Sequence, residues 1–123
     1  MNGPSQHRGL SPERWSAFSF DQQILAIGNE LNRTLSMLVA GEWQRAHQGY
    51  ERVLQLADLT IRLASTRARR RELLRWRDLI AALYLQSEPD AAEHRRVFRV
   101  LLQFTPAASR QIELLLGSRG VRS

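Results

Sequence analysis

The residues best suited to chemistry in this sequence are arginines. Six of them stand within eleven positions, in "RARRRELLRWR" from Arg67 to Arg77. A guanidinium group stays charged and donates five N–H groups in a planar fork, which suits it to phosphates and carboxylates. This segment holds six positive charges and one negative charge of a chain whose net charge is +6. The basicity is therefore local, and its purpose is the first question about function.

On a helix this segment would have two faces. Arg67, Arg71 and Arg75 are spaced at i, i+4 and i+8, which places them on one outward stripe, and Arg70 and Arg77 lie on its flank. We call these five residues the arginine patch. The apolar residues of the same segment point the other way: Leu73, Trp76 and Ile80. The spacing predicts a buried apolar face and an exposed basic one.

Three interpretations of the arginine patch remain open. The first is a solvated face, partly neutralised by acidic residues on this helix or its neighbours: Glu72, Asp78, Glu51 and Asp58. The second is nucleic-acid or other polyanion binding, whose affinity would fall by about two decades between roughly 50 and 200 mM salt. The third is an acidic protein surface, where arginine forms bidentate pairs with carboxylates. No recognition-helix motif, second basic patch or stacking platform supports the second interpretation.

The rest of the sequence has no recognisable catalytic or metal-binding motif. It contains no cysteine and no lysine, which excludes thiolate ligands, disulfides, lysine Schiff bases and the usual phosphate-binding loop. None of His7, His47 and His94 has a second histidine three or four residues away, and the three share no metal-ligand spacing. Glu93 directly precedes His94, so the two side chains point in different directions. We expect no enzymatic activity, no metal and no cofactor, with His47 as a half-buried helical histidine.

Apolar residues recur at steps of three and four along most of the chain, which predicts helices. A first helix should begin after Ser19, because Ser19 and Gln22 have capping-box spacing, and should end near Gly41. A second helix is expected over about 42–65 and a third over about 69–86. The residues that form their apolar stripes are Ile24, Ile27, Leu31, Leu35, Leu38, Trp43, Ala46, Tyr50, Val53, Ala57, Ile61, Ala64, Leu73, Trp76, Ile80, Leu83 and Tyr84.

A fourth helix should follow the "SEPD" turn, with Ser87 as its cap, and run to about Phe104. A residue before proline avoids the helical region, so the chain should break there, with Thr105 as a cap and Pro106 as the first residue of the next helix. A short fifth helix, or a bent continuation, should end at Gly117. The fourth helix should bury Val97, Phe98, Leu101 and Phe104.

Helices joined by short turns pack antiparallel, and no stretch alternates convincingly as a strand would. We therefore predict an all-α fold: an antiparallel up-down four-helix bundle with the last helix kinked or split near Pro106. Residues 1–18 are expected to form a flexible arm, 19–117 the bundle domain and 118–123 a disordered tail. Three aromatic residues can pin the end of the arm to the core: Trp15, Phe18 and Phe20.

The stretch "LVAGEWQRAHQGYERVLQLADLTIRLA", residues 38–64, together with chain length and helix order, resembles the flagellar secretion chaperones. Those proteins are small helical bundles that hold the disordered end of a flagellin subunit in apolar grooves before export. The resemblance implies a partner that is an apolar-faced peptide helix, with the arginines incidental. The chain departs from the family at "LAIGNEL", residues 25–31, where a Leu-Met-Leu-Tyr type segment is usual, and it lacks the family's N-terminal tyrosine motif.

These observations favour a non-enzymatic protein-interaction module, an adaptor or chaperone-like bundle that binds another protein or itself as a homodimer. The alternative is non-specific nucleic-acid or polyanion binding through Arg67 to Arg77. The longest apolar run, "LLL" at 114–116, is far shorter than the roughly 20 residues of a membrane span, so we expect a cytoplasmic protein without a membrane or small-molecule partner. The leucines that lie off the main stripes form a candidate apolar interface: Leu59, Leu63, Leu79 and Leu114.

Overall fold

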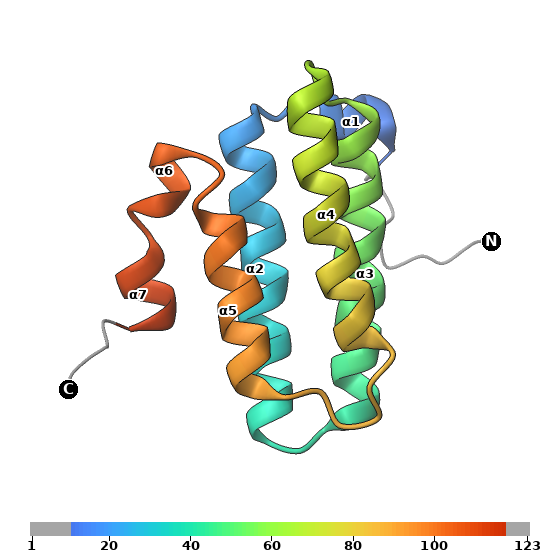
Figure 1. The fold of residues 1–123 in the computed structure, drawn as a ribbon, viewed down its shortest axis with the longest axis vertical. Coiled ribbons are helices and arrows are strands. Elements are labelled where there is room, and N and C mark those ends of the chain that lie inside the picture. The colour runs from blue at the N-terminus through green and yellow to red at the C-terminus, as the bar shows by residue number, and fades with distance from the viewer. Residues whose placement is uncertain (1–10, 118–123) are drawn as a thin grey trace.

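A computed structural model of the protein describes residues 11–117, which form helices and turns (Figure 1). The four long helices are α2 (Phe20–Val39), α3 (Trp43–Arg62), α4 (Arg67–Tyr84) and α5 (Ala91–Leu102). The three short ones are α1 (Pro12–Ser16), α6 (Pro106–Ser109) and α7 (Ile112–Leu116). The described part of the chain contains no strand, so the predicted all-α class is confirmed. No helix within it is both long and apolar enough to cross a bilayer.

The long helices lie side by side in a closed ring. α2 packs against α3 and α5, and α4 packs against the same two helices (Figure 1). α1 covers the C-terminal end of α3, while α6 contacts α2 and α7 contacts α5. Of the four neighbouring pairs of long helices, α4 and α5 are the least closely packed. Apolar side chains from both helices, Leu79 and Val100, are exposed at this seam.

The apolar stripes predicted from the sequence form the core. Burial removes them from water, which is the main favourable contribution to folding. The predicted residues that are buried are Ile24, Ile27, Leu31, Leu35, Leu38, Ala46, Tyr50, Val53, Ala57, Leu73, Trp76, Ile80, Leu83, Val97, Phe98 and Leu101. The predicted residues that are only half-buried are Trp43, Ile61, Ala64, Tyr84 and Phe104. Most of these five lie near the ends of helices, where the bundle opens.

Several helix ends follow the local sequence signals. The Ser19 hydroxyl accepts from the Gln22 N–H at 3.1 Å and the Gln22 amide oxygen accepts from the Ser19 N–H at 2.9 Å, which confirms the capping box. Gly41 has φ +74° in the turn after α2, a left-handed conformation that suits glycine. Thr105 caps α6 by accepting from the Ala108 N–H at 3.0 Å, with Pro106 as first helical residue, as predicted.

Other boundaries differ from the prediction. α5 begins at Ala91 because the Asp90 carboxylate accepts from the N–H groups of the two residues after Ala91, so the predicted Ser87 cap is wrong. α4 begins at Arg67 rather than 69, because the Thr66 hydroxyl accepts from the Arg69 N–H at 3.0 Å. Aspartate, threonine and serine are all favourable N-cap residues. At these two helix starts the caps are Asp90 and Thr66.

Helix α1 lies within the segment for which a flexible arm (residues 1–18) was predicted. Trp15 is 1% exposed, and its Nε1–H donates to the Thr60 hydroxyl oxygen at 3.0 Å. The Gln23 side-chain amide donates to the Trp15 carbonyl at 3.0 Å. Trp15 thus joins α1 to both α2 and α3, while Phe18 remains 40% exposed. The expected arm from 1 to 10 and tail from 118 to 123 lie outside the described residues.

Candidate functional site

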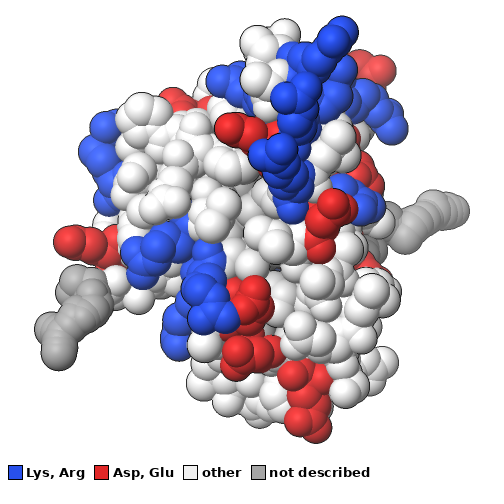
Figure 2. All heavy atoms as spheres, in the orientation of Figure 1, with Lys and Arg blue, Asp and Glu red and all other residues white. Residues whose placement is uncertain are grey.

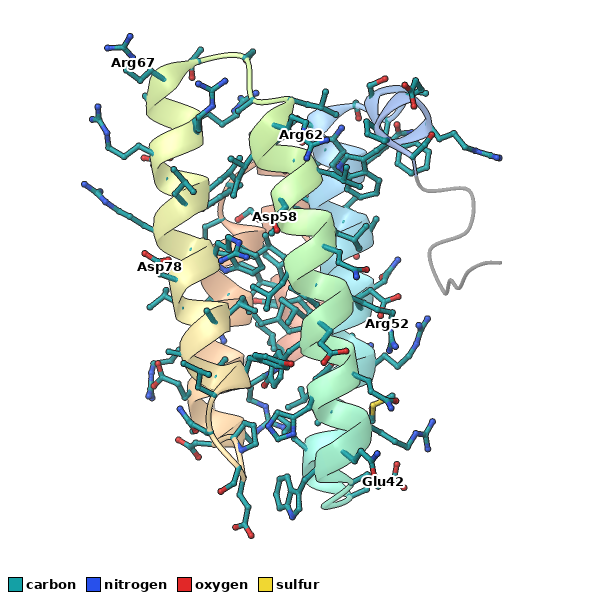
Figure 3. The ribbon with its side chains drawn as sticks, turned by 90° about the vertical axis from the view of Figure 1, so that its right-hand side faces the viewer. Glu42, Arg52, Asp58, Arg62, Arg67 and Asp78 are labelled. Atoms are coloured by element: carbon teal, nitrogen blue, oxygen red, sulfur yellow. The ribbon has the colours of Figure 1, made fainter. Side chains whose placement is uncertain are left out.

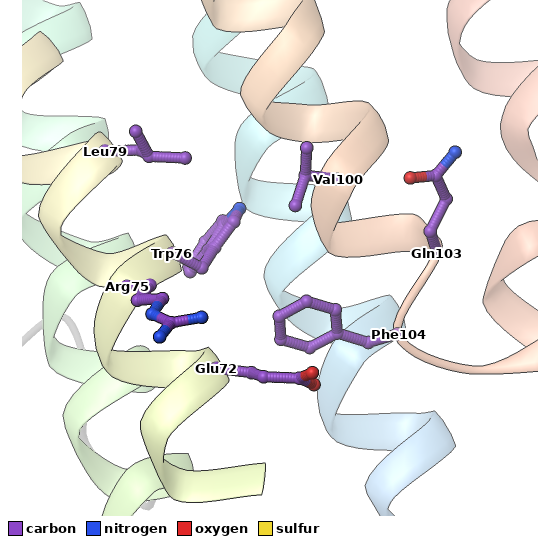
Figure 4. Close-up of a pocket in the computed structure, with 7 residues that line it drawn as sticks. All are labelled: Glu72, Arg75, Trp76, Leu79, Val100, Gln103 and Phe104. Carbon is purple, nitrogen blue, oxygen red and sulfur yellow. The ribbon is translucent and has the colours of Figure 1, made fainter. Parts of the chain in front are cut away.

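The open seam between α4 and α5 forms a groove of about 360 Å³ (Figure 4). Trp76 makes its floor and is 1% exposed. Leu79 on α4 and Val100 on α5 form opposite walls, and their side chains are 41% and 39% exposed. Phe104 bounds one end. The remaining lining residues are polar: Glu72, Arg75 and Gln103. We call this feature the α4–α5 groove.

One hydrogen bond joins the two helices below the groove. The Trp76 indole Nε1–H donates to the Val97 carbonyl oxygen at 2.9 Å, and this contact is buried. Tryptophan combines a large apolar surface with one N–H donor that must find a partner when buried. The Trp76 ring, which forms the floor of the groove, is therefore held to α5 by this hydrogen bond.

The sequence did not identify the groove. Phe104 was predicted to be buried, but α5 ends at Leu102 and α6 begins at Pro106. Phe104 therefore lies in the link between the two helices and extends toward Glu72 across the groove (Figure 4). Val100 was not singled out at all. Its position off the stripe of Val97 and Leu101 was the available signal, since an apolar residue off the core face has no partner inside the helix bundle.

Three arginines of the basic segment have partners within the protein. Arg77 forms a bidentate pair with Asp58, with Nε–Oδ1 at 2.6 Å and Nη2–Oδ2 at 3.3 Å, and this hydrogen bonding raises the pKa of Arg77. Arg70 reaches the Ile61 and Ala64 carbonyl oxygens at 3.5 Å, near the C-terminal end of α3. Arg69 lies 3.9 Å from the centre of the Phe20 ring. The predicted patch of five is therefore smaller as a free surface, because Arg70 and Arg77 are engaged.

Arg67, Arg71 and Arg75 are exposed and have no ion pair within residues 11–117. Figure 2 shows basic side chains gathered along the N-terminal half of α4, beside uncharged surface. In Figure 3, Arg67 points away from the packed helices. We call these three residues the arginine row. The row ends at Arg75, which lines the α4–α5 groove, so the free positive charge and the exposed apolar surface are continuous.

The four candidate leucines do not form one surface. Leu59 is half-buried against the core, and Leu79 lies in the α4–α5 groove. Leu63 is 38% exposed and lines a second hollow of about 230 Å³, which also includes Phe18. Leu114 is 80% exposed on α7. The structure therefore distributes these leucines over separate places, and Leu79 alone joins other exposed apolar residues in the α4–α5 groove.

The buried histidine belongs to a polar network in the core. His94 Nε2 lies 2.9 Å from the Leu31 carbonyl oxygen, and Nδ1 lies 2.7 Å from the Tyr50 hydroxyl oxygen. A carbonyl oxygen only accepts, so Nε2 carries the proton and Nδ1 accepts from Tyr50. Burial lowers the pKa of His94 to about 4 and raises the pKa of Tyr50. Both side chains are fully buried, which favours a structural role.

The other candidate ligands are scattered. His47 is half-buried, as predicted, with Nδ1 at 2.8 Å from the Trp43 carbonyl oxygen and Nε2 at 2.6 Å from the Gln86 carbonyl oxygen. These contacts join α3 to the turn after α4. His7 lies outside the described residues. Between residues 11 and 117 no three acidic or histidine side chains are grouped closely enough to hold a metal ion.

Comparison of the chain with protein-family models, with curated proteins and with solved structures gives no match. The interpretation of function therefore depends on the α4–α5 groove and the arginine row.

Proposed function

We propose that the protein is a non-enzymatic protein-interaction module, adaptor or chaperone-like, that binds its partner in the α4–α5 groove. The observation that carries the proposal is the pair of half-exposed walls, Leu79 and Val100, above the buried Trp76. Concave apolar surfaces with a few polar groups at the edge are typical of sites where helices or peptides dock. A flagellar-chaperone-like role, holding an apolar-faced peptide, is one form of this function.

We also propose that α2 to α5 constitute an antiparallel up-down four-helix bundle whose last helix is split near Pro106. The ring of contacts among these helices and the short turns between them support this proposal. In a bundle of this kind the seam between α4 and α5 can serve as a docking site, because α3 and α2 hold these two helices in place. The partner would then add a further helix to the seam.

Polyanion binding is the second candidate, and the lack of ion pairs on the arginine row favours it. Three arginine–phosphate contacts would give a logarithmic salt slope of about −2.7 on duplex DNA. The slope for the predicted patch of five would be steeper, but Arg70 and Arg77 are engaged within the protein. This candidate leaves the apolar walls of the groove without a role, so we rank it second.

The test is photo-crosslinking from the groove in cells. A photoreactive residue at position 79 or 100 is expected to give a discrete protein adduct, because each side chain is about two-fifths exposed in the groove. Positions 39 and 85 are the controls: Val39 and Leu85 are more exposed, at 68% and 81%, lie at the C-terminal ends of α2 and α4, and do not line the groove.

An adduct with the mass of a second copy would identify the partner as the protein itself. An adduct sensitive to nuclease would replace the protein partner with a nucleic acid. Equal crosslinking from all four positions, or none from 79 and 100, would contradict the proposal.

A further inference from the structure

We infer that the α4–α5 groove takes one amphipathic helix that carries carboxylates at four-residue steps beside its apolar face. This inference rests on the proposed function and specifies the chemistry of the partner. It follows from the alignment of the arginine row with the groove, from the shape of the groove and from the charge around it.

The arginine row and one wall of the groove lie on one i, i+4 ridge of α4, which winds around the helix by about 40° at each step. Arg67, Arg71, Arg75 and Leu79 follow one another at steps of four residues. Four residues of an α-helix rise by about 6 Å, so the guanidinium groups are spaced about as far apart as carboxylates at the same steps on another helix. A helix that crosses α4 along this ridge can therefore place carboxylates opposite the arginines of the row and its next apolar residue opposite Leu79.

The groove itself suits one row of apolar side chains. Its walls are a single residue from each helix, Leu79 and Val100, and its floor is one indole ring, Trp76. An amphipathic helix presents such a row at positions i, i+3 or i+4, and i+7. An extended strand would instead need a free sheet edge for its backbone groups, and the described residues contain no strand.

The charge around the groove favours an acidic partner over a neutral one. Glu72 is the one carboxylate among the residues that line the groove. On the α5 side, Arg95 and Arg99 are exposed and have no ion pair within residues 11–117, while Arg96 pairs with Glu93. Figure 2 shows basic side chains over both helices, with mainly uncharged surface between them and acidic side chains beside each basic group. Guanidinium–carboxylate pairs are often bidentate, so they fix the orientation of the partner's carboxylates as well as attracting them.

The test compares two synthetic helical peptides by fluorescence anisotropy with the full-length protein. Both have leucines in one helical stripe; the acidic peptide has glutamates at three flanking positions four residues apart, and the neutral peptide has glutamines there. We expect the acidic peptide to bind at least about tenfold more tightly, since each exposed pair contributes modestly and three act together. The difference should vanish at about 1 M salt, where the Debye length is about 3 Å.

The double variant Arg71→Glu, Arg75→Glu should abolish the preference for the acidic peptide. These side chains have no hydrogen-bond partner within the described residues, so the fold should be preserved, as circular dichroism would show. The matched control is Arg14→Glu with Arg62→Glu, which changes the net charge equally at exposed arginines on α1 and α3. Figure 3 labels Arg62. The control should bind both peptides as the unmodified protein does.

Variants of the groove walls distinguish this inference from the proposed function. Leu79→Ser with Val100→Ser should weaken both peptides, whereas Val39→Ser with Leu85→Ser should weaken neither. If the two peptides bind with equal affinity and both lose it in the Leu79 and Val100 variant, the inference of an acidic partner is wrong. The groove would then still be a docking site. If neither peptide binds, or if the Leu79→Ser, Val100→Ser variant binds both peptides as tightly as the unmodified protein does, the inference is wrong. Crosslinking from position 79 would still test the proposed function separately.

Discussion

Acidification from pH 7 to pH 4 is expected to lower the free energy of unfolding by about 3 kcal/mol through His94 alone. The unfolded chain takes up a proton with the ordinary histidine pKa of 6.5, whereas burial keeps the folded-state pKa at about 4. The stabilising contribution is therefore complete above pH 6.5 and is lost as pH falls toward 4. Protonation would also place a second N–H on Nδ1, opposite the Tyr50 hydroxyl that now donates to it.

The measurement is urea unfolding at a series of pH values, with His94→Gln as the matched variant. Glutamine retains one donor and one acceptor but does not titrate between pH 4 and 7. The surface carboxylates titrate in both proteins, so their contribution cancels in the difference. We expect the two curves to converge as pH falls from 6.5 to 4. Parallel curves over this range would show that His94 is not buried in its neutral form.

Gly49→Ala is expected to destabilise the protein by about 2 kcal/mol. A Cβ at this position would lie 2.2 Å from the Thr34 hydroxyl oxygen and 3.2 Å from the Thr34 Cβ. Thr34 is fully buried, and its hydroxyl donates to the Glu30 carbonyl at 2.9 Å, so it has little freedom to move. Overpacking of about 3 kcal/mol would exceed the gain of about 1 kcal/mol from replacing glycine by alanine in a helix.

Thermal unfolding with two companion variants checks the cause. Gly28→Ala is the matched control: its Cβ would meet Phe98 and Leu102 at 3.4 and 3.5 Å, which is ordinary contact, so the change should be neutral or slightly stabilising. Thr34→Ala combined with Gly49→Ala should recover part of the lost stability, because the hydroxyl is removed. If Gly28→Ala and Gly49→Ala behave alike, the close approach of α2 and α3 at Gly49 is not a constraint on the fold.

The interior could be predicted from the sequence because it depends on local periodicity. Residues such as Ile24, Ile27 and Leu31 repeat at steps of three and four, and burying one helical stripe removes them all from water together. The caps at Ser19 and Thr105 were equally accessible, since each satisfies backbone donors only three residues away. Signals that act within one turn of a helix require no knowledge of the tertiary arrangement.

Asp58 was named as one acidic residue that could neutralise the arginine patch, but which arginine pairs with which partner could not be predicted, because the partners come from other helices. Arg77 pairs with Asp58 across nineteen residues, whereas Asp58 also has Arg62 four residues away on its own helix. Arg69 lies over Phe20, the first residue of α2. Only the tertiary arrangement separates these engaged arginines from the arginine row. The groove was missed for the same reason, since its walls belong to two helices.

The segment around Trp15 shows a further limit of sequence reasoning: Trp15 was expected to pin the arm to the core, but helix α1 that carries it was not predicted. This segment contains proline, glycine and many polar residues, a composition that favours disorder. The structure nevertheless buries Trp15 against Thr60 and Gln23, because one indole ring can fill the end of the bundle and find partners for its N–H and for the carbonyl beside it. A single large residue outweighs the average character of its neighbours.

The measurement that most directly tests protein docking in the α4–α5 groove is an NMR titration of the labelled protein with the acidic helical peptide. The predicted result is a saturable shift of the Leu79 and Val100 methyl signals and of the Trp76 indole signal, with Val39 and Leu85 unchanged. Shifts confined to Arg67, Arg71 and Arg75, without change at the groove walls, would contradict apolar docking. Shifts on another face of the protein would contradict the site itself.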